Sequence, residues 1–451
     1  MDRPRRASFS SSFLSHCVRY SGKTALVGFY CLNGDVRVAV LCKNSAEFLK
    51  IVLASLHVGL TVVPLNPSLK PYELETYLAQ AAVNLLVYDS AAISEEQLPS
   101  DVPKFSIIQL QASDFDKEEN VEYTEKKSGE IIFFSSGTTG LPKPFIYSQR
   151  VLNAQLRQFQ MIAADDKFFS PDSKDVCYGV LPYFHAGGLI TVFSMLFCGC
   201  SVVVNGRWNE REFFETIQNF QVSCLYIVPP VMKFLSSTAI IHEYQLDSLR
   251  TIYVGAAPTD VRCFSAVSDR LPNLQNLIQL YGATECGVLI SSSLKGKTDG
   301  RHVGKALPGV KLKIDREGHI HVFSLTSTTR NFMDTGDLGE IDKAGNLVIL
   351  GRDKEMLKVR GWQVNPNEVE NMIRRLEDVQ DCAVFVKQTE EQEDHLMALV
   401  VGQTPLEKVK RIVRENLASY KQLHEAFRVP SLPRNTSGKL QRQLLHELVP
   451  K

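Results

Sequence analysis

Short apolar runs alternate with amphipathic segments in the first two thirds of the chain, and this alternation constrains the fold more than any other feature. The runs VRVAVLC, LTVVPLN and NLLVY are separated by SAEFLKIVLASLHV and PYELETYLAQAAV, whose apolar residues recur at helical spacing. We expect Asn44 to cap the first helix, with Glu47 as its capping partner, and Pro71 to open the second. This order predicts a parallel sheet covered by helices on both faces.

The alternation returns downstream in VCYGVLP, EREFFETIQNF, SCLYIVPP and RTIYVGAAP. After residue 330, closely spaced turn signals predict short antiparallel strands. PNEVENMIRRL, CAVFVK, LMALVV and LEKVKRIVRENL then predict a small α+β unit. We therefore expect an α/β protein in two domains. Residues 1–352 form a large N-terminal domain of parallel sheets covered by helices plus a β-rich subdomain, and residues 353–451 form a small mobile α+β C-terminal domain.

Charge and cysteine content narrow the classes of function. Lys and Arg number 50, as do Asp and Glu, so no basic excess points to nucleic acid or an anionic membrane surface. The ten cysteines form no C-x-x-C pair and no H-E-x-x-H is present, which argues against a structural zinc site or a disulfide framework.

Two further segments concern membrane insertion and the cellular compartment. The longest apolar run, LITVFSMLFCGCSVVV, contains Gly199 and is short for a membrane span, so we expect a buried helix followed by a strand. The Ser- and Arg-rich N-terminus permits a mitochondrial leader, but FLSHCV reads as the start of a first helix. We expect a cytoplasmic protein, with a mitochondrial one as the alternative.

Residues 135–144, SSGTTGLPKP, follow the apolar run EIIFF. Their glycines, hydroxyls and Lys143 suit either a surface turn or an anion cradle, in which backbone N–H groups and hydroxyls donate to phosphate. The G-x-x-x-x-G-K-[ST] spacing is absent, which disfavours a P-loop kinase or GTPase. Three more loops, PYFHAGG, GAAP and LYGATEC, follow predicted strands, and ligands of such sheets bind at the carboxyl ends of strands.

Together with DTGD, GRDKEMLKVRGWQV and LPRNTSGKLQR, these stretches resemble the adenylate-forming superfamily of acyl- and aryl-CoA synthetases, firefly-type luciferases and peptide-synthetase adenylation domains. The branch that looks most similar is the 4-coumarate-CoA ligase and luciferase-like group. The resemblance implies that a carboxylic acid is activated by ATP as an acyl-adenylate, with release of pyrophosphate, and is then transferred to coenzyme A. The implied ligands are a small-molecule carboxylic acid, ATP, Mg²⁺ and coenzyme A.

The resemblance also implies roles for single residues. Lys439 would reach the carboxylate and the α-phosphate as the main catalytic residue, Thr284 would donate to the α-phosphate, and Glu285 would hold Mg²⁺. His185 would stand at the wall of the acyl pocket, and Lys354 would be the hinge between the domains. The remaining residues of the nucleotide and coenzyme A sites would be Ser135, Ser136, Gly137, Thr138, Thr139, Gly140, Lys143, Gly255, Ala256, Ala257, Tyr281, Gly282, Asp337, Arg352, Lys358, Gly361 and Gln363.

Within that set, Tyr281 would cover the adenine, and Asp337 and Arg352 would contact the ribose. Lys358, Gly361 and Gln363 would face the active site when the small domain closes for the second half-reaction. Ordinary local structure offers alternatives for several of these residues. The Thr-Glu pair can begin a helix, the Asp-Gly pair of DTGD can make a hairpin turn, and His185 can be a hydrogen-bonded structural histidine.

Two other functions stay open at this point. One is a related enzyme that passes the acyl group to oxygen or to a carrier protein. The other is a non-catalytic nucleotide-binding relative, suggested by Pro144, where the family normally has glycine, and by two shortened segments. Retention of Lys439 and Glu285 favours an enzyme. Small or apolar residues at Val228, Gly255 and Cys286 suit an aryl or a medium aliphatic acid.

Overall fold

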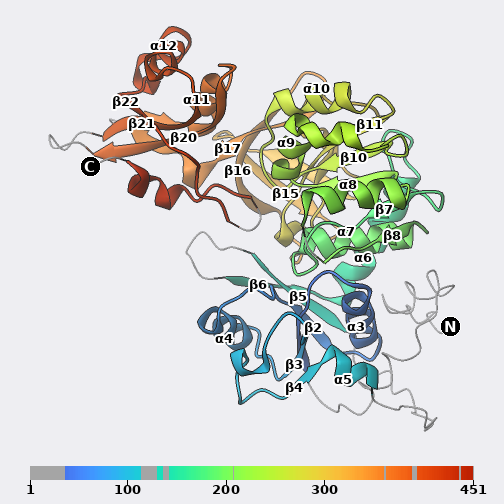
Figure 1. The fold of residues 1–451 in the computed structure, drawn as a ribbon. Helices are drawn as coiled ribbons and strands as arrows, with labels where there is room; N and C mark the ends of the chain where they lie inside the picture. The colour runs from blue at the N-terminus through green and yellow to red at the C-terminus, as the bar shows by residue number, and fades with distance from the viewer. Residues whose placement is uncertain are drawn as a thin grey trace.

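The computed structural model describes residues 36–112, 129–135, 142–206, 208–359, 362–388, 394–435 and 438–449. Two sheets with parallel cores are followed by an antiparallel sheet and a smaller C-terminal unit (Figure 1). No helix within these ranges is long and apolar enough to cross a membrane. The helix predicted to begin at FLSHCV lies outside them.

The first sheet has six strands in the order β4-β3-β1-β2-β5-β6, all parallel except β6. Val38 and Val40 pack into one apolar cluster with helix α3, whereas Ala39 and Leu41 pack into another with helix α4. Helices therefore cover both faces, as predicted. The elements are β1 (Arg37–Leu41), α3 (Ala46–His57), β2 (Thr61–Pro64), α4 (Pro71–Gln80), β3 (Leu85–Tyr88), β4 (Lys104–Ser106), α5 (Ile107–Ala112), β5 (Glu130–Ser135) and β6 (Lys143–Tyr147).

The second sheet has seven strands in the order β13-β12-β11-β10-β9-β7-β8, with β7 to β11 parallel. Helices α3, α6 and α7 share one apolar cluster with strands of both sheets and so form the layer between them, while α8, α9 and α10 cover the outer face. The elements are α6 (Gln149–Ala163), β7 (Val176–Tyr178), α7 (Ala186–Phe197), β8 (Ser201–Val203), α8 (Glu210–Asn219), β9 (Cys224–Ile227), α9 (Pro229–Ser237), β10 (Thr251–Val254), α10 (Val261–Arg270), β11 (Asn276–Tyr281), β12 (Ser291–Ser292) and β13 (Lys305–Ala306).

The longest apolar run forms α7 and β8, which confirms the predicted buried helix followed by a strand. Helix α7 is buried nearly all round because it lies between two sheets. Each fully buried aliphatic side chain in such a layer contributes about 1.5–3 kcal/mol to stability. The apolar character of this run therefore reflects its burial between the two sheets.

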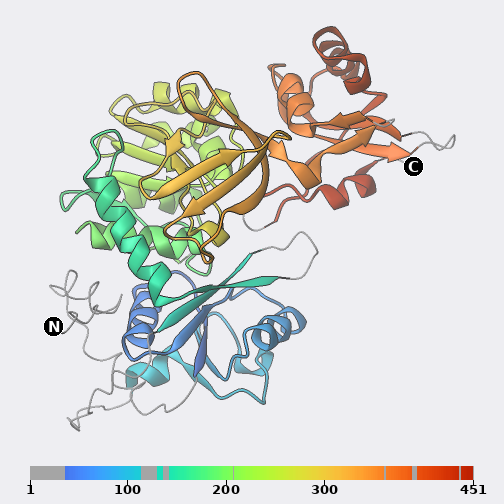
Figure 2. The ribbon, with the colours of Figure 1, turned by 180° about the vertical axis from the view of Figure 1, so that it is seen from behind.

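An antiparallel sheet follows, in the order β14-β15-β16-β17, and a C-terminal unit succeeds it. The C-terminal unit lies beside β16, β17 and α9 rather than beside the first sheet (Figures 1 and 2). The elements are β14 (Val310–Ile314), β15 (His319–Ser324), β16 (Met333–Ile341), β17 (Leu347–Arg352), β18 (Leu357–Val359), β19 (Trp362–Val364), α11 (Pro366–Ile373), β20 (Val379–Gln388), β21 (Asp394–Gly402), α12 (Leu406–Asn416), β22 (Glu425–Arg428) and the 3₁₀ helix η6 (Arg442–Leu448).

Helices α9 and α10 of the second sheet contact the C-terminal unit. Lys233 Nζ donates to the carbonyl oxygen of Gln380 at 2.7 Å, and Arg262 Nη1 donates to that of Leu376 at 3.5 Å. Gly438 of the C-terminal unit lies against Pro230 at the start of α9. These contacts set the orientation of the two parts, and the division at residues 352 and 353 stays a prediction.

One local prediction is wrong, and one alternative is excluded. Ser45, not Asn44, caps α3, because the Asn44 side chain instead donates to the carbonyl oxygen of Leu181 at 2.8 Å and accepts from the Tyr183 backbone N–H. DTGD makes no hairpin turn, since it lies within strand β16. The segment after Lys439 forms the 3₁₀ helix η6.

Candidate active site

Loops from several strands converge at one edge of the two parallel sheets. Strands β9, β10 and β11 are parallel neighbours, so their carboxyl ends lie side by side. Strand β5 of the first sheet ends at Ser135, in the loop that the sequence assigns to phosphate. Predicted site residues at these ends come from segments more than a hundred residues apart, and the fold brings them to one edge.

The two ends of the predicted phosphate loop face one another. Ser135 of β5 pairs with Lys143 of β6, and Lys143 is exposed. Pro144 follows in β6, which is the edge strand of its sheet, and proline is tolerated at such an edge. The residues between these ends that the sequence assigns to phosphate lie outside the described part: Ser136, Gly137, Thr138, Thr139 and Gly140.

The loop after β10 carries an uncommon backbone conformation. Ala256 has φ of 76°, in the left-handed region that residues with a side chain rarely adopt. Such strain persists where surrounding structure holds it, and it concentrates at ligand sites. Gly255, Ala256 and Ala257 thus form a fixed small-residue wall beside β11, consistent with the predicted adenine site.

A triad of hydrogen-bonded side chains around the buried Asp337 links β11 to the antiparallel sheet. The Tyr281 hydroxyl donates to Asp337 Oδ2 at 2.7 Å, and Arg352 Nε donates to Asp337 Oδ1 at 3.0 Å. Asp337 is only 7% exposed. Burial, followed by the Asp337 carboxylate, raises the pKa of Tyr281 well above its usual value, so the hydroxyl keeps its proton and donates. Each carboxylate oxygen retains a lone pair for a further donor, as binding of ribose hydroxyls requires.

Thr284 and Glu285 lie in the short 3₁₀ helix η3 (Thr284–Cys286), which follows strand β11. The Tyr147 hydroxyl donates to the carbonyl oxygen of Thr284 at 2.6 Å, which ties the loop to the first sheet. Gly282 is required here, because an added Cβ would lie 1.4 Å from the carbonyl oxygen of Val288. Within the described residues, no hydrogen bond or ion pair engages the Glu285 carboxylate, so it suits a hard cation such as Mg²⁺.

His185 stands at the N-terminus of α7 with its ring 4.5 Å from the Phe184 ring, centre to centre. Burial, with a smaller contribution from the Lys439 charge, lowers the pKa of His185 to about 4, so the imidazole is neutral at pH 7. Its Nε2 is buried and finds no hydrogen-bond partner in the described part of the chain. The alternative of a fully hydrogen-bonded structural histidine therefore loses support.

Lys439 reaches this region from the C-terminal unit. Its loop is held by the Asn435 side chain, which accepts from the Lys439 backbone N–H at 2.9 Å. Burial lowers the pKa of Lys439, the Arg352 guanidinium adds to that effect, and the Asp337 and Glu285 carboxylates oppose it. The residue as a whole is nonetheless exposed, so part of its side chain remains in contact with solvent. The structure thus brings Lys439 together with the residues predicted to bind nucleotide and metal.

The residues predicted for the second half-reaction form a small hairpin. Lys358 of β18 pairs with Gln363 of β19. Gly361 and the side chains of Lys358 and Gln363 lie outside the described part. Strand β18 follows the 3₁₀ helix η4 (Asp353–Glu355), which contains the predicted hinge.

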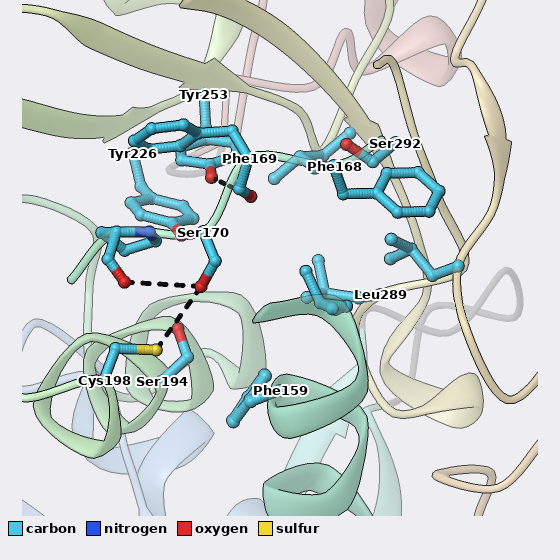
Figure 3. Close-up of a pocket in the computed structure, with 14 residues that line it drawn as sticks. Phe159, Phe168, Phe169, Ser170, Ser194, Cys198, Tyr226, Tyr253, Leu289 and Ser292 are labelled. Atoms are coloured by element: carbon cyan, nitrogen blue, oxygen red, sulfur yellow. Dashed lines mark hydrogen bonds between the residues drawn. The ribbon is translucent and has the colours of Figure 1, made fainter. Parts of the chain in front are cut away.

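An apolar cavity lies between α6, α7 and the second sheet (Figure 3). The rings of Tyr226 and Tyr253 stack at 4.3 Å on one side of it. Its volume is about 40 Å³, room for roughly three water molecules. The other labelled lining residues are Phe159, Phe168, Phe169, Ser170, Ser194, Cys198, Leu289 and Ser292.

Two of the lining residues lie on elements that also carry residues of the candidate site. Leu280, another lining residue, directly precedes Tyr281 of the triad. Ser194 lies on the same helix as His185, nine residues further on, or about 14 Å along the axis at the usual helical rise. No sequence motif marked Tyr226, Tyr253 and Leu280 as lining a cavity. Their aromatic and branched side chains in buried strands carried only the ordinary signal of a core.

Comparison with known families matches most of the chain. The model of the AMP-binding enzyme family covers residues 30–322, and that of the AMP-binding enzyme C-terminal domain covers residues 368–439. The 4-coumarate–CoA ligase CCL1 of Humulus lupulus is 27% identical over 466 residues, covering 91% of this chain and 84% of that protein. The probable 4-coumarate–CoA ligase 1 of Dictyostelium discoideum is 28% identical over 504 residues, covering 97% and 90%.

Solved structures share the fold. The ATP-bound MatB from Rhodopseudomonas palustris superimposes with a TM-score of 0.80 at 23% identity, covering 97% of this chain and 92% of that one. The anthranilate CoA ligase AuaEII in complex with anthranoyl-AMP gives 0.81 at 20% identity, covering 99% and 98%. The o-succinylbenzoate CoA synthetase MenE from Bacillus subtilis, in complex with ATP and magnesium ion, gives 0.77 at 23% identity, covering 94% and 91%. These matches confirm the predicted α/β architecture.

Proposed function

This chain belongs to the AMP-binding enzyme family, and from that premise we propose that it is an ATP-dependent carboxylate–CoA ligase. A carboxylate oxygen attacks the α-phosphorus of ATP, the acyl-adenylate forms, and pyrophosphate leaves. The thiol of coenzyme A then attacks the acyl carbon, and AMP leaves as the thioester forms. The observation that carries this proposal is that the charges of Glu285, Asp337 and Arg352, which come from the other part of the molecule, act on the Lys439 ammonium.

The first step brings two negatively charged reactants together, so the protein must supply positive charge. We assign that role to Lys439 at the reacting oxygens and to Lys143 at the phosphate tail. A preorganised donor aimed at charge that builds in the transition state contributes about 3 kcal/mol. Glu285 would hold Mg²⁺, which, when bound, offsets phosphate charge. Asp337 would accept from the ribose hydroxyls while Tyr281 and Arg352 fix its orientation.

The second step needs the C-terminal domain, residues 353–451, to turn about Lys354. In this proposal Lys439 leaves the site and the hairpin carrying Lys358 and Gln363 enters. The contacts of that domain with the rest support a reversible arrangement. Within the described residues, the hydrogen bonds between α9 or α10 and the C-terminal unit each join one long side chain to a backbone carbonyl, and none is a buried ion pair.

The residues that line the cavity favour an apolar carboxylic acid as the substrate. Its walls are mainly aromatic and aliphatic, and its polar groups are hydroxyls and a thiol, with no charged side chain. A second carboxylate on the substrate would find no counter-ion there. We therefore propose an aryl or a short aliphatic acid, and a bulkier one would require side-chain movement because the cavity is only about 40 Å³. We place the reaction in the cytoplasm, with the mitochondrion as the alternative.

The experiment is a panel of acids given with MgATP and coenzyme A to the full chain, with products identified by mass. The panel contains 4-coumarate, anthranilate, octanoate and o-succinylbenzoate, which is the doubly charged control. We expect AMP and an acyl thioester from an apolar acid and none from the control. AMP without thioester would assign the acyl group to oxygen or a carrier protein. Nucleotide binding without any AMP would make the chain a non-catalytic relative.

A further inference from the structure

A cluster of two histidines and two acids lies at the hairpin between β14 and β15, in the antiparallel sheet. His319 Nδ1 is 3.1 Å from Asp315 Oδ2, and His321 Nε2 is 3.0 Å from the same oxygen. Asp315, Glu317 and His319 each place one ligand atom within 4.8 Å of the others. Residues two apart on a strand share a face, so both rings point to one side of β15.

The carboxylate is held so that one oxygen is left for these rings. Asp315 Oδ1 accepts from the backbone N–H groups of Glu317 at 3.1 Å and His319 at 2.8 Å. Oδ2 therefore points at the two imidazoles in a fixed orientation. In the ranges that the structure describes, no hydrogen bond or ion pair joins Asp315, His319 or His321 to Tyr281 or Arg352.

We propose that Asp315, Glu317 and His319 form a binding site for a divalent transition metal ion of the Zn²⁺ class, with His321, whose ring contacts the same Asp315 oxygen, as a fourth ligand. Imidazole nitrogen and carboxylate oxygen are donors that Zn²⁺ accepts, at about 2.0–2.2 Å each. Tetrahedral ligands at that bond length lie roughly 3.3 Å apart. The distances of 3.1 Å and 3.0 Å between the ring nitrogens and Asp315 Oδ2 are within a few tenths of an ångström of that spacing.

A further carboxylate lies near the other ring nitrogen of His319. His319 Nε2, the nitrogen that would not bind the metal, faces Asp353 Oδ1 at 3.7 Å. Metal-ligating histidines commonly direct their other N–H to a carboxylate, which fixes the ring and raises its basicity. Asp353 begins η4, the segment leading into the C-terminal unit. The proposed site therefore touches the junction of the two parts.

The sequence has no C-x-x-C pair and no H-E-x-x-H, the patterns that most directly predict a zinc site. It does contain His-x-His in GHIHV, four residues after Asp315. On a strand this spacing places two rings on one face, whereas on a helix it would separate them. Only the hairpin brings Asp315 to both rings.

The test titrates ZnCl₂ into the tag-free, chelator-treated full chain by calorimetry, and CoCl₂ in parallel by visible absorption. We expect one tight ion per chain and a Co²⁺ spectrum of a tetrahedral nitrogen and oxygen site. His321→Gln should weaken Zn²⁺ binding by at least about tenfold, and Asp353→Asn by about tenfold through the outer contact. The matched control is His242→Gln, an exposed histidine outside the cluster, which should bind as the parent does.

Two results would overturn the proposal. One is the absence of Zn²⁺ binding to the parent chain. The other is equal binding by His321→Gln and His242→Gln, which would place the ion elsewhere. Circular dichroism of each variant separates loss of the site from loss of the fold. The readout needs no substrate, so its failure leaves the proposed ligase activity untouched.

Discussion

Gly438 is the point where the loop carrying Lys439 meets the other part of the molecule. Its φ of 78° lies in the left-handed region, and an added Cβ would stand 2.5 Å from Pro230 Cγ and 3.1 Å from Pro230 Cδ. Carbon atoms in good contact are about 3.5–4.0 Å apart. Gly438→Ala therefore forces the loop away from α9 by about 1 Å, and a misplacement of that size costs about 100-fold in rate.

The clash with Pro230 and the backbone strain at residue 438 can be tested separately. In Pro230→Ala the Cγ and Cδ atoms are absent, and the remaining Cβ lies 3.9 Å from the added methyl group, an ordinary contact. The double variant keeps only the left-handed strain of alanine, about 1–2 kcal/mol. That strain corresponds to a deficit of roughly 5- to 30-fold. We thus expect about 100-fold loss for Gly438→Ala, partial recovery in the double variant, and near-parent activity for Pro230→Ala.

The assay is exchange of labelled pyrophosphate into ATP, with the acid that the panel identifies, and circular dichroism to establish that each variant is folded. Exchange reports adenylate formation alone. Full exchange activity in Gly438→Ala would refute the claim that this contact positions Lys439. Equal activity of Gly438→Ala and the double variant would show that the clash with Pro230 has no part in the loss.

Three further predictions concern the site itself. Lys439→Ala should lower adenylate formation by about 100-fold, the value of one donor of about 3 kcal/mol, yet largely spare thioester formation from preformed adenylate. The exposed Lys408→Ala is its control, and equal loss in both half-reactions would contradict the assignment. Tyr281→Phe removes a hydrogen bond to the Asp337 carboxylate, worth about 1.5–3 kcal/mol. It should raise KM for ATP by about tenfold or more, and an unchanged KM would exclude Asp337 as the ribose ligand. His185, whose folded pKa of about 4 lies below the unfolded value of 6.5, binds its proton less well when folded. Stability should therefore fall as pH drops from 6.5 towards 4, by up to about 3 kcal/mol, and His185→Gln should lessen this fall in urea midpoints measured at pH 7 and 5.

The sequence by itself determined the elements and the class of fold. Pro71 predicted the start of α4, and apolar spacing predicted α7 and β8. These signals are local, because the periodicity of a helix or strand depends on residues that are near in sequence. The motifs also placed Tyr281, Asp337 and Lys439 in one site by resemblance. That the loops should meet followed from the parallel sheet, whose strand ends share an edge.

Only the tertiary structure decided which side chains meet. Asn44 failed as a cap because its partners, Leu181 and Tyr183, lie more than a hundred residues away. The stacked rings of Tyr226 and Tyr253 line a cavity, although each residue alone looked like core. A contact between distant segments depends on how whole layers pack, and no local period carries that information.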